Sequence, residues 1–413
     1  MDFDLIREEG RIVCNNYSLN STSPIGFSQK DVYCDYTEFE DTIGSLIFFA
    51  TAFVFLMAFA IVGNAVVMWI IYKHKVMDTG FNRFLFNMAL ADLMIALFNV
   101  GTTWTFNFYY DWWYGSLCTP TTFFGIAPTT VSVFSMMSLS WDRCQAVVNP
   151  LRKRPLSRKR SLHAITAIWL VSAITALPLT VVAQVNEVWF YNINWDRAFS
   201  RRLCTHREDT AIPLTLVNQG LFVMQYALPL FVLSFTFARI AWAFRSTDEA
   251  TDNNSKGASH TKAKSKAIKM LGLMVFAFMV CWLPYHLYHT FELSALFPPQ
   301  DQQTSKYIYL AIYWIAMSST AYNPIIYCMA NERFRIGFRF AFRWLPCVQF
   351  KKEDYEYSQL FPEKLRTMAI CMQMAKRVPD QSSTGLGFTY HSGGDALSPL
   401  LTKEKSRSKR VDV

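Results

Sequence analysis

The chain has 413 residues, of which 52% are hydrophobic, 16% aromatic and only 17% charged. A composition this apolar excludes an ordinary array of soluble domains and indicates a membrane protein. The net charge of +9 fits either nucleic acid or an anionic membrane surface as a partner. The position of the charges along the chain decides in favour of the membrane.

The first segment, residues 1–43, is acidic and contains nine Asp and Glu against three Lys and Arg. It holds two N-glycosylation sequons, at Asn16 and Asn20, which fit an exterior location. We therefore expect residues 1–43 to form an extracellular, glycosylated N-terminal tail.

Residues 44–330 contain seven apolar runs, each close to the roughly 20 residues that cross a bilayer as a helix. The runs cover residues 46–72, 84–109, 119–141, 164–183, 212–237, 270–288 and 307–329. Seven buried helices of a soluble bundle would need polar faces, which these runs lack. The predicted fold class is an all-α membrane protein, a bundle of seven transmembrane helices.

The orientation of the bundle follows from the basic residues of the short loops. Lys73 and Lys75 follow the first run, six Lys and Arg lie between residues 152 and 160, and five lie between residues 245 and 266. All three loops are on one side, which is therefore cytoplasmic. The chain is predicted to be a multi-pass protein of the plasma membrane with its N-terminus outside.

The cysteines divide between the two sides of the membrane. Cys118 opens the third run from outside and Cys204 lies in the outer loop before the fifth, where oxidation is allowed. We expect these two to be bonded. Cys14 and Cys34 are also outside, and a second bridge between them remains an open alternative.

A basic amphipathic helix is predicted after the seventh run, over residues 331–347. Phe334, Phe338, Phe342 and Leu345 recur at helical spacing with arginines between them, which is typical of a helix lying on the inner leaflet. Cys347 is a candidate for palmitoylation, with a plain cysteine as the alternative. Residues 348–413 are polar and rich in Ser and Thr, so we expect a disordered cytoplasmic tail that receptor kinases and arrestin recognise.

Polar residues and prolines inside the runs form a recognisable set, one group to each run. The set consists of Asn64 in "GNAVV", Asp92 in "LADL", Asp142 and Arg143 in "WDRC", Trp169 in "IWLV", Pro229 in "ALPL", Trp282 and Pro284 in "CWLP", and Asn323, Pro324 and Tyr327 in "NPIIY". Seven matches in order resemble the signatures of rhodopsin-like G-protein-coupled receptors.

The resemblance implies roles for several of these residues. An allosteric sodium ion would be bound by Asp92, Ser132, Ser319 and Asn323. No other cofactor is implied. Asp142 and Arg143 would pair at rest and release the arginine to a heterotrimeric G protein, with Pro324 and Tyr327 acting as a switch.

This chain departs from the family pattern near the arginine. Cys144 and Phe237 replace two tyrosines, and Lys264 stands where some relatives carry an acidic partner for the arginine. We expect coupling to the G protein to be retained, with measurable basal activity.

Two classes of ligand, amines and retinal, are excluded first. Gly125 occupies the position where amine receptors carry an aspartate, and residues 307–329 hold no lysine for retinal. Four stretches are similar to those of tachykinin receptors: "YLAIYWIAMSSTAYNPIIYC", "KAIKMLGLMVFAFMVCWLPYH", "NERFRIGFRFAFR" and "WWYGSLC". The similarity extends from about residue 46 to residue 345.

The tachykinin resemblance implies a pocket for an amidated peptide C-terminus. Binding such a peptide needs hydrogen-bonding groups and aromatic surface. Its residues would be Asn99, Trp282, Tyr285, His286 and Tyr309. Aromatic surface would come from Trp104, Phe106, Tyr109, Trp112 and Trp113, for which an interfacial belt is the alternative. Three positions differ from the residues of better-known tachykinin receptors: Thr121, Thr122 and Leu179. The peptide selectivity is therefore expected to be that of an invertebrate-type tachykinin receptor.

The alternatives to a tachykinin-like receptor are another peptide receptor, a transporter or channel, and an enzyme. A receptor for another amidated neuropeptide, such as a neuropeptide Y/F-like peptide, is the nearest alternative. A transporter or channel would carry inverted repeats or charges on several spans, and an enzyme would carry a metal cluster, a nucleophile with its base, or a phosphate loop. The sequence shows none of these features, so we expect neither an enzyme nor a nucleic-acid partner. We expect the receptor to signal to phospholipase C and calcium.

Overall fold

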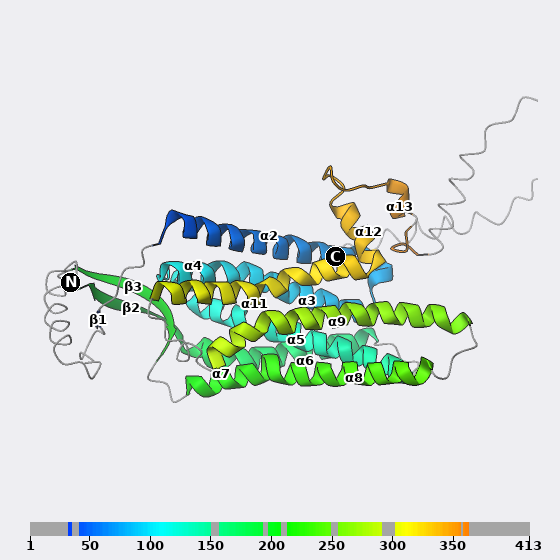
Figure 1. The fold of residues 1–413 in the computed structure, drawn as a ribbon, viewed down its shortest axis with the longest axis horizontal. Helices are drawn as coiled ribbons and strands as arrows, with labels where there is room; N and C mark the ends of the chain where they lie inside the picture. Colours follow the sequence, from blue (N-terminus) through cyan, green and yellow to red (C-terminus); the bar gives the residue numbers. More distant parts are fainter. Residues whose placement is uncertain are drawn as a thin grey trace, which may run out of the picture. The chain divides into compact units, whose positions relative to one another are not determined.

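The computed structural model describes residues 32–34, 41–149, 157–192, 197–207, 213–248, 255–290, 302–356 and 358–362. All of them belong to one compact unit, residues 1–366. Long helices pack side by side in this unit, with a β-hairpin at one end of the bundle and two short helices at the other (Figure 1). These two ends are called below the hairpin end and the Arg143 end.

Each of the seven predicted spans corresponds to one helical segment of the structure, so the predicted seven-helix bundle is confirmed. The segments are α2 (Ile43–Lys73); α3 (Gly80–Ile95) continued by η2 (Ala96–Val100) and α4 (Gly101–Tyr109); α5 (Cys118–Val148); α6 (Arg158–Val182); α7 (Leu214–Phe222) continued by η4 (Val223–Ala227) and α8 (Leu228–Asp248); α9 (Ser255–Thr290); and α11 (Gln302–Ala330). Short 3₁₀ turns, η1 (Lys75–Met77) and η3 (Gly115–Leu117), precede the second and third segments.

Six of these segments, among the residues described, are long and apolar enough to cross a membrane. The exception is α11, which has 29 residues but is rich in tyrosine, serine and threonine. It packs between α2 and α9 in the bundle. Its polar side chains therefore meet neighbouring helices, as expected for a helix that lines an internal cavity.

Polar side chains cap the helices where the chain leaves them exposed. Thr42 Oγ1 accepts from the backbone N–H of Ser45 at 3.1 Å, and Thr79 Oγ1 accepts from that of Asn82 at 3.2 Å. The backbone N–H groups of a first helical turn have no partner within the helix. These caps set the start of α2 and α3 a few residues before the predicted apolar runs.

Two spans contain a π-helical segment that the sequence analysis did not predict. In the second span η2 holds Asn99, and in the fifth span η4 holds Gln225, four residues before Pro229. Proline clashes with the carbonyl of the residue four positions earlier, here Gln225, so a wider turn relieves the clash. Both π segments place a polar residue toward the interior of the bundle, where Asn99 and Gln225 are buried.

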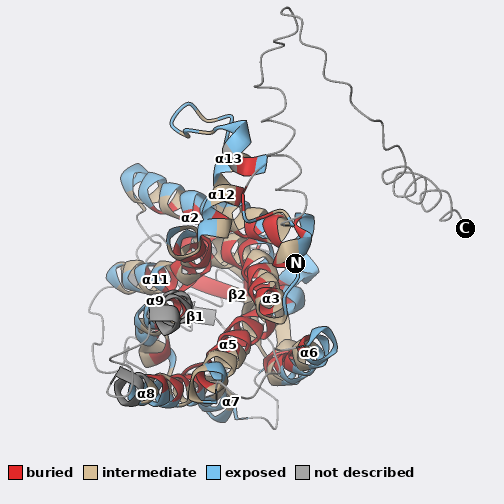
Figure 2. Ribbon diagram, turned by 90° about the vertical axis from the view of Figure 1, so that its right-hand side faces the viewer, coloured by how far each residue is buried: buried red, intermediate tan, exposed pale blue. Residues whose placement is uncertain are grey.

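Burial separates an exposed outer surface from the packed interior of the bundle (Figure 2). Large apolar side chains such as Phe55, Leu170 and Phe231 remain more than half exposed. The interior instead holds polar groups, including Asn64, Asp92 and Asn323. The interior also contains a large apolar core. Exposed apolar side chains outside and polar groups held between the helices are what a bilayer environment requires.

A three-stranded sheet covers the hairpin end. Strands β2 (Ala183–Asn192) and β3 (Arg197–His206) pair antiparallel, and β1 (Val32–Cys34) adds to β2 in parallel. The sheet is tied to the bundle because Trp112 N donates to Arg202 O at 2.7 Å and Arg202 N donates to Asp111 Oδ1 at 2.9 Å. The all-α prediction thus holds for the spans, while the loop between the fourth and fifth is a hairpin.

The predicted amphipathic helix is present as α12 (Glu332–Ala341), with Phe334 fully buried and Arg335 and Arg339 exposed. It is shorter than the predicted residues 331–347, so Phe342 and Leu345 lie after its end. The expectation of disorder from residue 348 onward is wrong for the residues just after it. Helix α13 (Lys352–Glu356) forms there, and Tyr355 and Leu360 are buried. The physical reason is aromatic packing: Tyr355 stacks on Phe340 of α12 with ring centroids 4.0 Å apart.

Candidate functional site

A cavity of about 350 Å³ opens near the hairpin end of the bundle, and we call it the ligand cavity. All five residues predicted to contact a peptide line it: Asn99, Trp282, Tyr285, His286 and Tyr309. Thr121, Thr122 and Leu179, the predicted points of departure in selectivity, line it as well. The structure thus brings together residues from the second, third, fourth, sixth and seventh spans.

Asn99 is held in place by partners within the protein. Its Oδ1 accepts from the Tyr313 hydroxyl at 2.8 Å, while its Nδ2 donates to Thr103 Oγ1 at 3.2 Å and to Thr121 O at 3.3 Å. A Cβ at Gly125 would lie 2.7 Å from Asn99 Nδ2. Glycine at position 125 therefore leaves room for the amide of Asn99, which joins the second, third and seventh spans.

His286 carries an unsatisfied polar atom. The residue is 4% exposed, and its Nε2 has no hydrogen-bond partner among the described residues. Its ring packs near those of Tyr226 and Trp282, with centroids 5.1 and 5.7 Å away. A buried polar atom without a partner costs free energy, so Nε2 is a ready contact for a ligand.

Several cavity residues were not predicted. Tyr313 lies one helical turn after Tyr309, a spacing that indicates a shared face and was available from the sequence. Gln225 donates from Nε2 to Thr130 Oγ1 at 2.9 Å, but it faces the bundle because of the π segment η4, which no sequence pattern marked. His206 enters from β3, and burial lowers its pKa, which favours the neutral ring.

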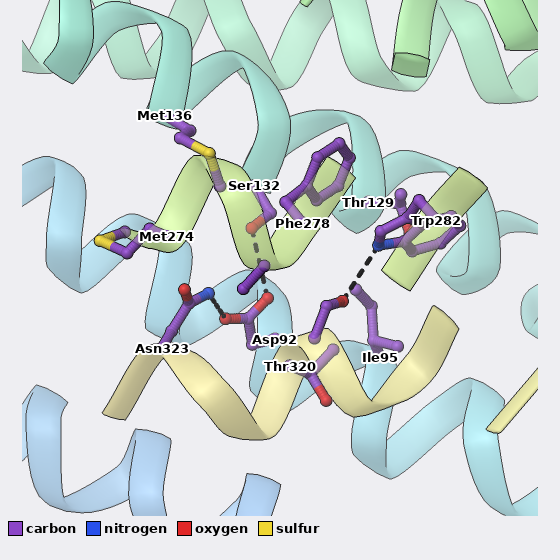
Figure 3. A pocket seen from close by; sticks show the side chains of 12 residues that line it. Asp92, Ile95, Thr129, Ser132, Met136, Met274, Phe278, Trp282, Thr320 and Asn323 are labelled. Atoms are coloured by element: carbon purple, nitrogen blue, oxygen red, sulfur yellow. Dashed lines mark hydrogen bonds between the residues drawn. The ribbon is translucent and has the colours of Figure 1, made fainter. Parts of the chain in front are cut away.

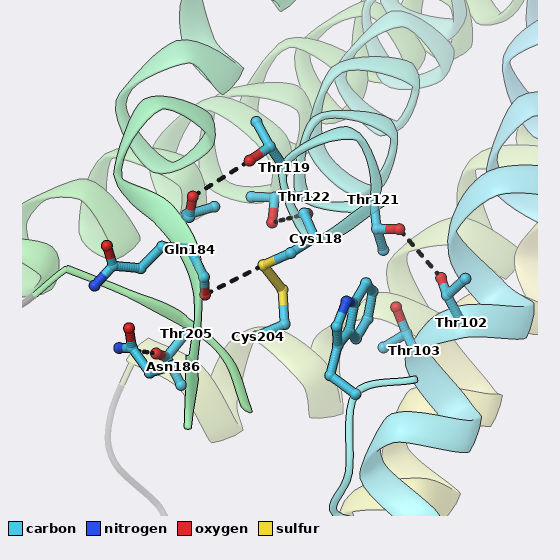
Figure 4. Close-up of a disulfide and its surroundings, with 12 residues drawn as sticks. Thr102, Thr103, Cys118, Thr119, Thr121, Thr122, Gln184, Asn186, Cys204 and Thr205 are labelled. Atoms are coloured by element: carbon cyan, nitrogen blue, oxygen red, sulfur yellow. Dashed lines mark hydrogen bonds between the residues drawn. A yellow bond between two sulfur atoms is a disulfide. The ribbon is translucent and has the colours of Figure 1, made fainter. Parts of the chain in front are cut away.

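The predicted disulfide is present: Cys118 at the start of α5 is bonded to Cys204 of β3 (Figure 4). The hairpin is further held by the Thr119 hydroxyl, which donates to Ala183 O at 3.3 Å. Cys204 and His206 both line the ligand cavity. The disulfide therefore fixes the hairpin as one wall of the cavity.

The predicted aromatic surface is only partly assembled at the cavity. Phe106 and Trp112 line it, although Trp112 Nε1 also donates to Gly115 O at 2.8 Å. Trp104 instead stacks on Phe53 inside the bundle, with centroids 5.4 Å apart. Tyr109 and Trp113 pack on each other, 4.6 Å between centroids, and do not line the cavity.

A second, smaller cavity of about 20 Å³ surrounds Asp92, and we call it the Asp92 cavity (Figure 3). Asp92 Oδ1 accepts from Ser132 Oγ at 3.3 Å and Oδ2 accepts from Asn323 Nδ2 at 2.8 Å. Ser319 also lines the cavity. The four residues predicted to share a sodium ion thus meet at one place.

The donor set of the Asp92 cavity fits a hard monovalent cation. One carboxylate, two hydroxyl oxygens and one amide oxygen are available, and such oxygen ligands suit hard metal ions. The volume exceeds the space that one water molecule needs, so a single small ion has room. Asp92 is buried, and the described residues that line the cavity include no cationic side chain, which favours binding of a counter-ion.

Trp282 connects the two cavities. It lines both of them, and its Nε1 donates to Ser319 Oγ at 3.0 Å. Movement of this indole by a ligand would therefore alter a side chain of the Asp92 cavity.

At the Arg143 end, the predicted ion pair is formed. Arg143 donates to Asp142 Oδ2 from its terminal nitrogen at 2.5 Å and from Nε at 3.1 Å, and its guanidinium lies 4.5 Å from the Phe81 ring centroid. Cys144 is buried beside it. Lys264 lies in α9 among residues whose side chains are not described.

Tyr327 and Pro324 occupy contrasting surroundings in α11. The Tyr327 side chain is fully buried, and its hydroxyl has no partner among the described residues. Pro324 lies against α2, where a Cβ at Gly63 would be 2.9 Å from its ring. A buried hydroxyl without a partner, three residues after a proline, indicates a residue that finds its partner in another conformation.

Some predicted modification sites fall at or beyond the edges of the description. Asn16, Asn20 and Cys14 lie outside the described residues. Cys347 is exposed and not bonded to another cysteine.

Comparison with known proteins agrees with the geometry of the bundle. Residues 63–327 match the model of the 7 transmembrane receptor (rhodopsin family). The chain is similar to a probable G-protein coupled receptor, tkr-1, of Caenorhabditis elegans, with 56% identity covering 95% of this chain and 96% of that protein.

Two mammalian relatives are also similar over most of the chain. The Substance-K receptor of Rattus norvegicus is 38% identical, covering 75% of this chain and 77% of the relative. The Neuromedin-K receptor of Rattus norvegicus is 34% identical, covering 73% and 65% respectively. The chain therefore belongs to the rhodopsin family of seven-transmembrane receptors; it is a multi-pass membrane receptor and not an enzyme.

Proposed function

We propose that this chain is a plasma-membrane receptor for an amidated, tachykinin-like neuropeptide, with its hairpin end outside the cell. The observation that carries the proposal is the ligand cavity, in which aromatic rings surround uncharged hydrogen-bonding groups. His286 contributes a buried Nε2 without a partner there. The names of the Substance-K and Neuromedin-K receptors support the same class of ligand.

The chemistry of the cavity favours an amide over a carboxylate. No Lys, Arg, Asp or Glu is among the described residues that line it. A peptide C-terminal amide brings donors and an acceptor without a charge, and these suit His286, Tyr285 and the neighbouring threonines. A free carboxylate would be buried without a cationic partner, which is costly.

The proposed signal path runs from the ligand cavity to the Arg143 end. A peptide that moves Trp282 disturbs Ser319 and the Asp92 cavity, where we propose a sodium ion held by Asp92, Ser132, Ser319 and Asn323. Rearrangement of α11 near Pro324 and Tyr327 then accompanies release of Arg143 from Asp142. The freed arginine contacts a heterotrimeric G protein, with phospholipase C and calcium downstream.

Other partners of the receptor are proposed from the sequence. Glycans on Asn16 and Asn20 face outward, a palmitate on Cys347 anchors the residues after α12, and receptor kinases and arrestin recognise Ser and Thr beyond residue 362. The basic, amphipathic α12 supports contact with membrane lipid.

A second candidate is a receptor for another amidated neuropeptide, such as a neuropeptide Y/F-like peptide. Thr121, Thr122 and Leu179 favour it because they line the ligand cavity and depart from the tachykinin pattern.

The test is calcium release in cells expressing the full chain, exposed to a panel of amidated neuropeptides. Tachykinin-like peptides ending in Arg-amide or Met-amide are expected to act at the lowest concentrations. Silence of all of these, with a response to a neuropeptide Y/F-like peptide, would transfer the receptor to the second class.

A further inference from the structure

An apolar groove of about 490 Å³ runs along the outer surface where α2, α11 and α12 meet. Its walls come from the middle of α2, which includes Phe55, Ala58 and Gly63, and from α11 between Ala321 and Met329. Phe338 of α12 and Phe342, which directly follows that helix, complete the lining. The groove is separate from the ligand cavity and the Asp92 cavity, since none of its lining residues belongs to either.

The lining determines what can enter. Apart from the sulfur of Cys328 and of Met329, the side chains that form it are hydrocarbon. Phe59 and Met329 are 63% and 66% exposed, so the groove opens onto the surface that faces the bilayer. A polar ligand would lose its hydrogen bonds there, whereas a hydrocarbon chain would not, and the volume lies within the range of small-ligand sites.

A fixed cation lies at the end of the groove. Arg335 of α12 donates from Nε to Cys328 O at 3.2 Å and from its terminal nitrogen to Met329 O at 2.7 Å. Both carbonyls belong to residues that line the groove. Arg335 is nonetheless exposed, as is Arg339 further along α12. Arg343 lies just after the helix and is also exposed, although one of its terminal nitrogens donates to Phe340 O at 2.8 Å.

We propose that this groove is a binding site for an anionic phospholipid of the inner leaflet. One acyl chain occupies the groove, and the headgroup phosphate pairs with Arg335 and the neighbouring arginines of α12. Each arginine near the surface strengthens binding of such a lipid by roughly fivefold, because it contributes about 1 kcal/mol. The charge of α12 distinguishes this occupant from a sterol, whose single hydroxyl makes no use of it.

The site has a consequence for signalling. Pro324 and Ile325 line the groove, and Pro324 contacts α2 at Gly63. A change of α11 at Pro324 would alter the walls of the groove, so the lipid and the receptor conformation influence each other. The assignment to the inner leaflet rests on the proposed orientation, but binding itself can be measured in a membrane with identical leaflets.

The experiment uses the full chain in nanodiscs of phosphatidylcholine, with a phospholipid probe that carries a diazirine on one acyl chain. The probe is made with a phosphatidylserine or a phosphatidylcholine headgroup, and labelled positions are found by peptide mass spectrometry. The serine probe is expected to label Ile325, Cys328 and Phe338 several-fold more than the choline probe.

Two variants make the result specific. Ala58→Trp fills the groove from an exposed position of α2 and is expected to abolish most of this labelling. The matched control Ala167→Trp, at an exposed position of α6 outside the groove, is expected to leave it unchanged. Replacing Arg339 by Gln keeps the contacts of Arg335 and should lower the preference for the serine probe by roughly fivefold.

Three results would overturn the proposal. The first is equal labelling in Ala58→Trp and Ala167→Trp receptors. The second is equal labelling by the two headgroups. The third is displacement of the serine probe by cholesterol at equal concentration, which would identify a sterol site. The thermal unfolding midpoint of each purified variant verifies that it is folded, so failure of the peptide assay to find a tachykinin-like ligand would not affect these outcomes.

Discussion

Trp282 Nε1 donates to Ser319 Oγ at 3.0 Å, and this bond joins the ligand cavity to the Asp92 cavity. The indole forms part of the wall of both cavities. Ser319 in turn donates to Ala316 O at 2.8 Å, so its oxygen lone pairs remain for the indole and for a cation. A ligand that shifts Trp282 therefore changes the surroundings of Asp92 directly.

This connection predicts that peptide and sodium oppose each other. Peptide affinity is expected to fall as sodium replaces potassium at constant ionic strength, because the ion stabilises the resting cavity and the coupling is reciprocal. Replacing Asp92 by Asn removes the charge and should flatten the dependence, and replacing Ser319 by Ala should weaken it. Radioligand binding to membranes measures the effect. An undiminished sodium response in the Asp92 variant would contradict the sodium assignment.

The hydrogen bond from Tyr313 to Asn99 predicts a stability effect in the ligand cavity. Replacing Tyr313 by Phe leaves the buried Asn99 Oδ1 without its partner, which typically costs about 1–3 kcal/mol. The thermal unfolding midpoint of the purified receptor should fall, and peptide affinity should weaken with it. The matched change Tyr309→Phe, made one turn away in the same helix, should have a smaller effect on the midpoint. Equal midpoints for wild type and Tyr313→Phe would show that the bond does not hold Asn99.

The Asp142–Arg143 pair lies at the opposite end of the bundle from the ligand cavity. Replacing Arg143 by Ala is expected to leave peptide affinity unchanged and to abolish calcium release, because the arginine acts only on the G protein side. Cys144→Tyr, which restores the residue usual in the family, should not reduce coupling. Binding and calcium release are measured on the same cells. Full calcium release by the Arg143 variant would refute the role given to the arginine.

The docking of residues 352–356 and 358–362 on the bundle predicts a pH dependence of stability. His74 Nδ1 lies 2.9 Å from Ile70 O, so it carries the proton, and Nε2 accepts from the Tyr355 hydroxyl at 2.8 Å. Burial lowers the pKa of His74, so folding disfavours its protonated form. Its contribution to stability is therefore present above the unfolded-state pKa of about 6.5 and is lost as the pH falls below that value.

The measurement is the thermal unfolding midpoint of the purified receptor from about pH 8 to about pH 5, a range that spans the ordinary pKa of histidine. The His74→Gln receptor should lose less stability on acidification than the wild type does. Tyr355→Phe keeps the ring stacked on Phe340 and serves as the control for loss of the hydrogen bond alone. Parallel pH profiles for wild type and His74→Gln would exclude His74 as the titrating group.

The seven spans, the disulfide and the membership of the ligand cavity were predictable because each rests on a local signal. Runs of apolar residues mark the spans, and Cys118 and Cys204 are both placed outside by the loop charges. Asn99, Trp282 and His286 each lie near a motif that fixes their position within a span. Their meeting in one cavity then follows from the resemblance to the receptor family.

Other features depend on tertiary packing and had no such signal. The π segments shift the hydrogen-bond register of the second and fifth spans, and this shift turns Gln225 into the bundle. Trp104 was expected on the ligand side, but the flat ring of Phe53 offers it a stacking partner inside the bundle. Tyr355 and Leu360 lie in a polar stretch of the sequence. Their burial becomes favourable only because α12 offers an aromatic surface and His74 Nε2 accepts from the Tyr355 hydroxyl.

The proposal that the cavity reads an amidated peptide C-terminus is tested most directly by comparing matched amide and free-acid peptides in cells expressing this chain, with calcium release as the readout. The acid adds a buried charge that no described residue of the cavity lining can neutralise, a penalty of several kcal/mol. The free-acid peptide should therefore be weaker by on the order of a hundredfold or more, at 1.4 kcal/mol per factor of ten. Equal potency of the two peptides would contradict the account, because the cavity would then not distinguish an amide from a carboxylate.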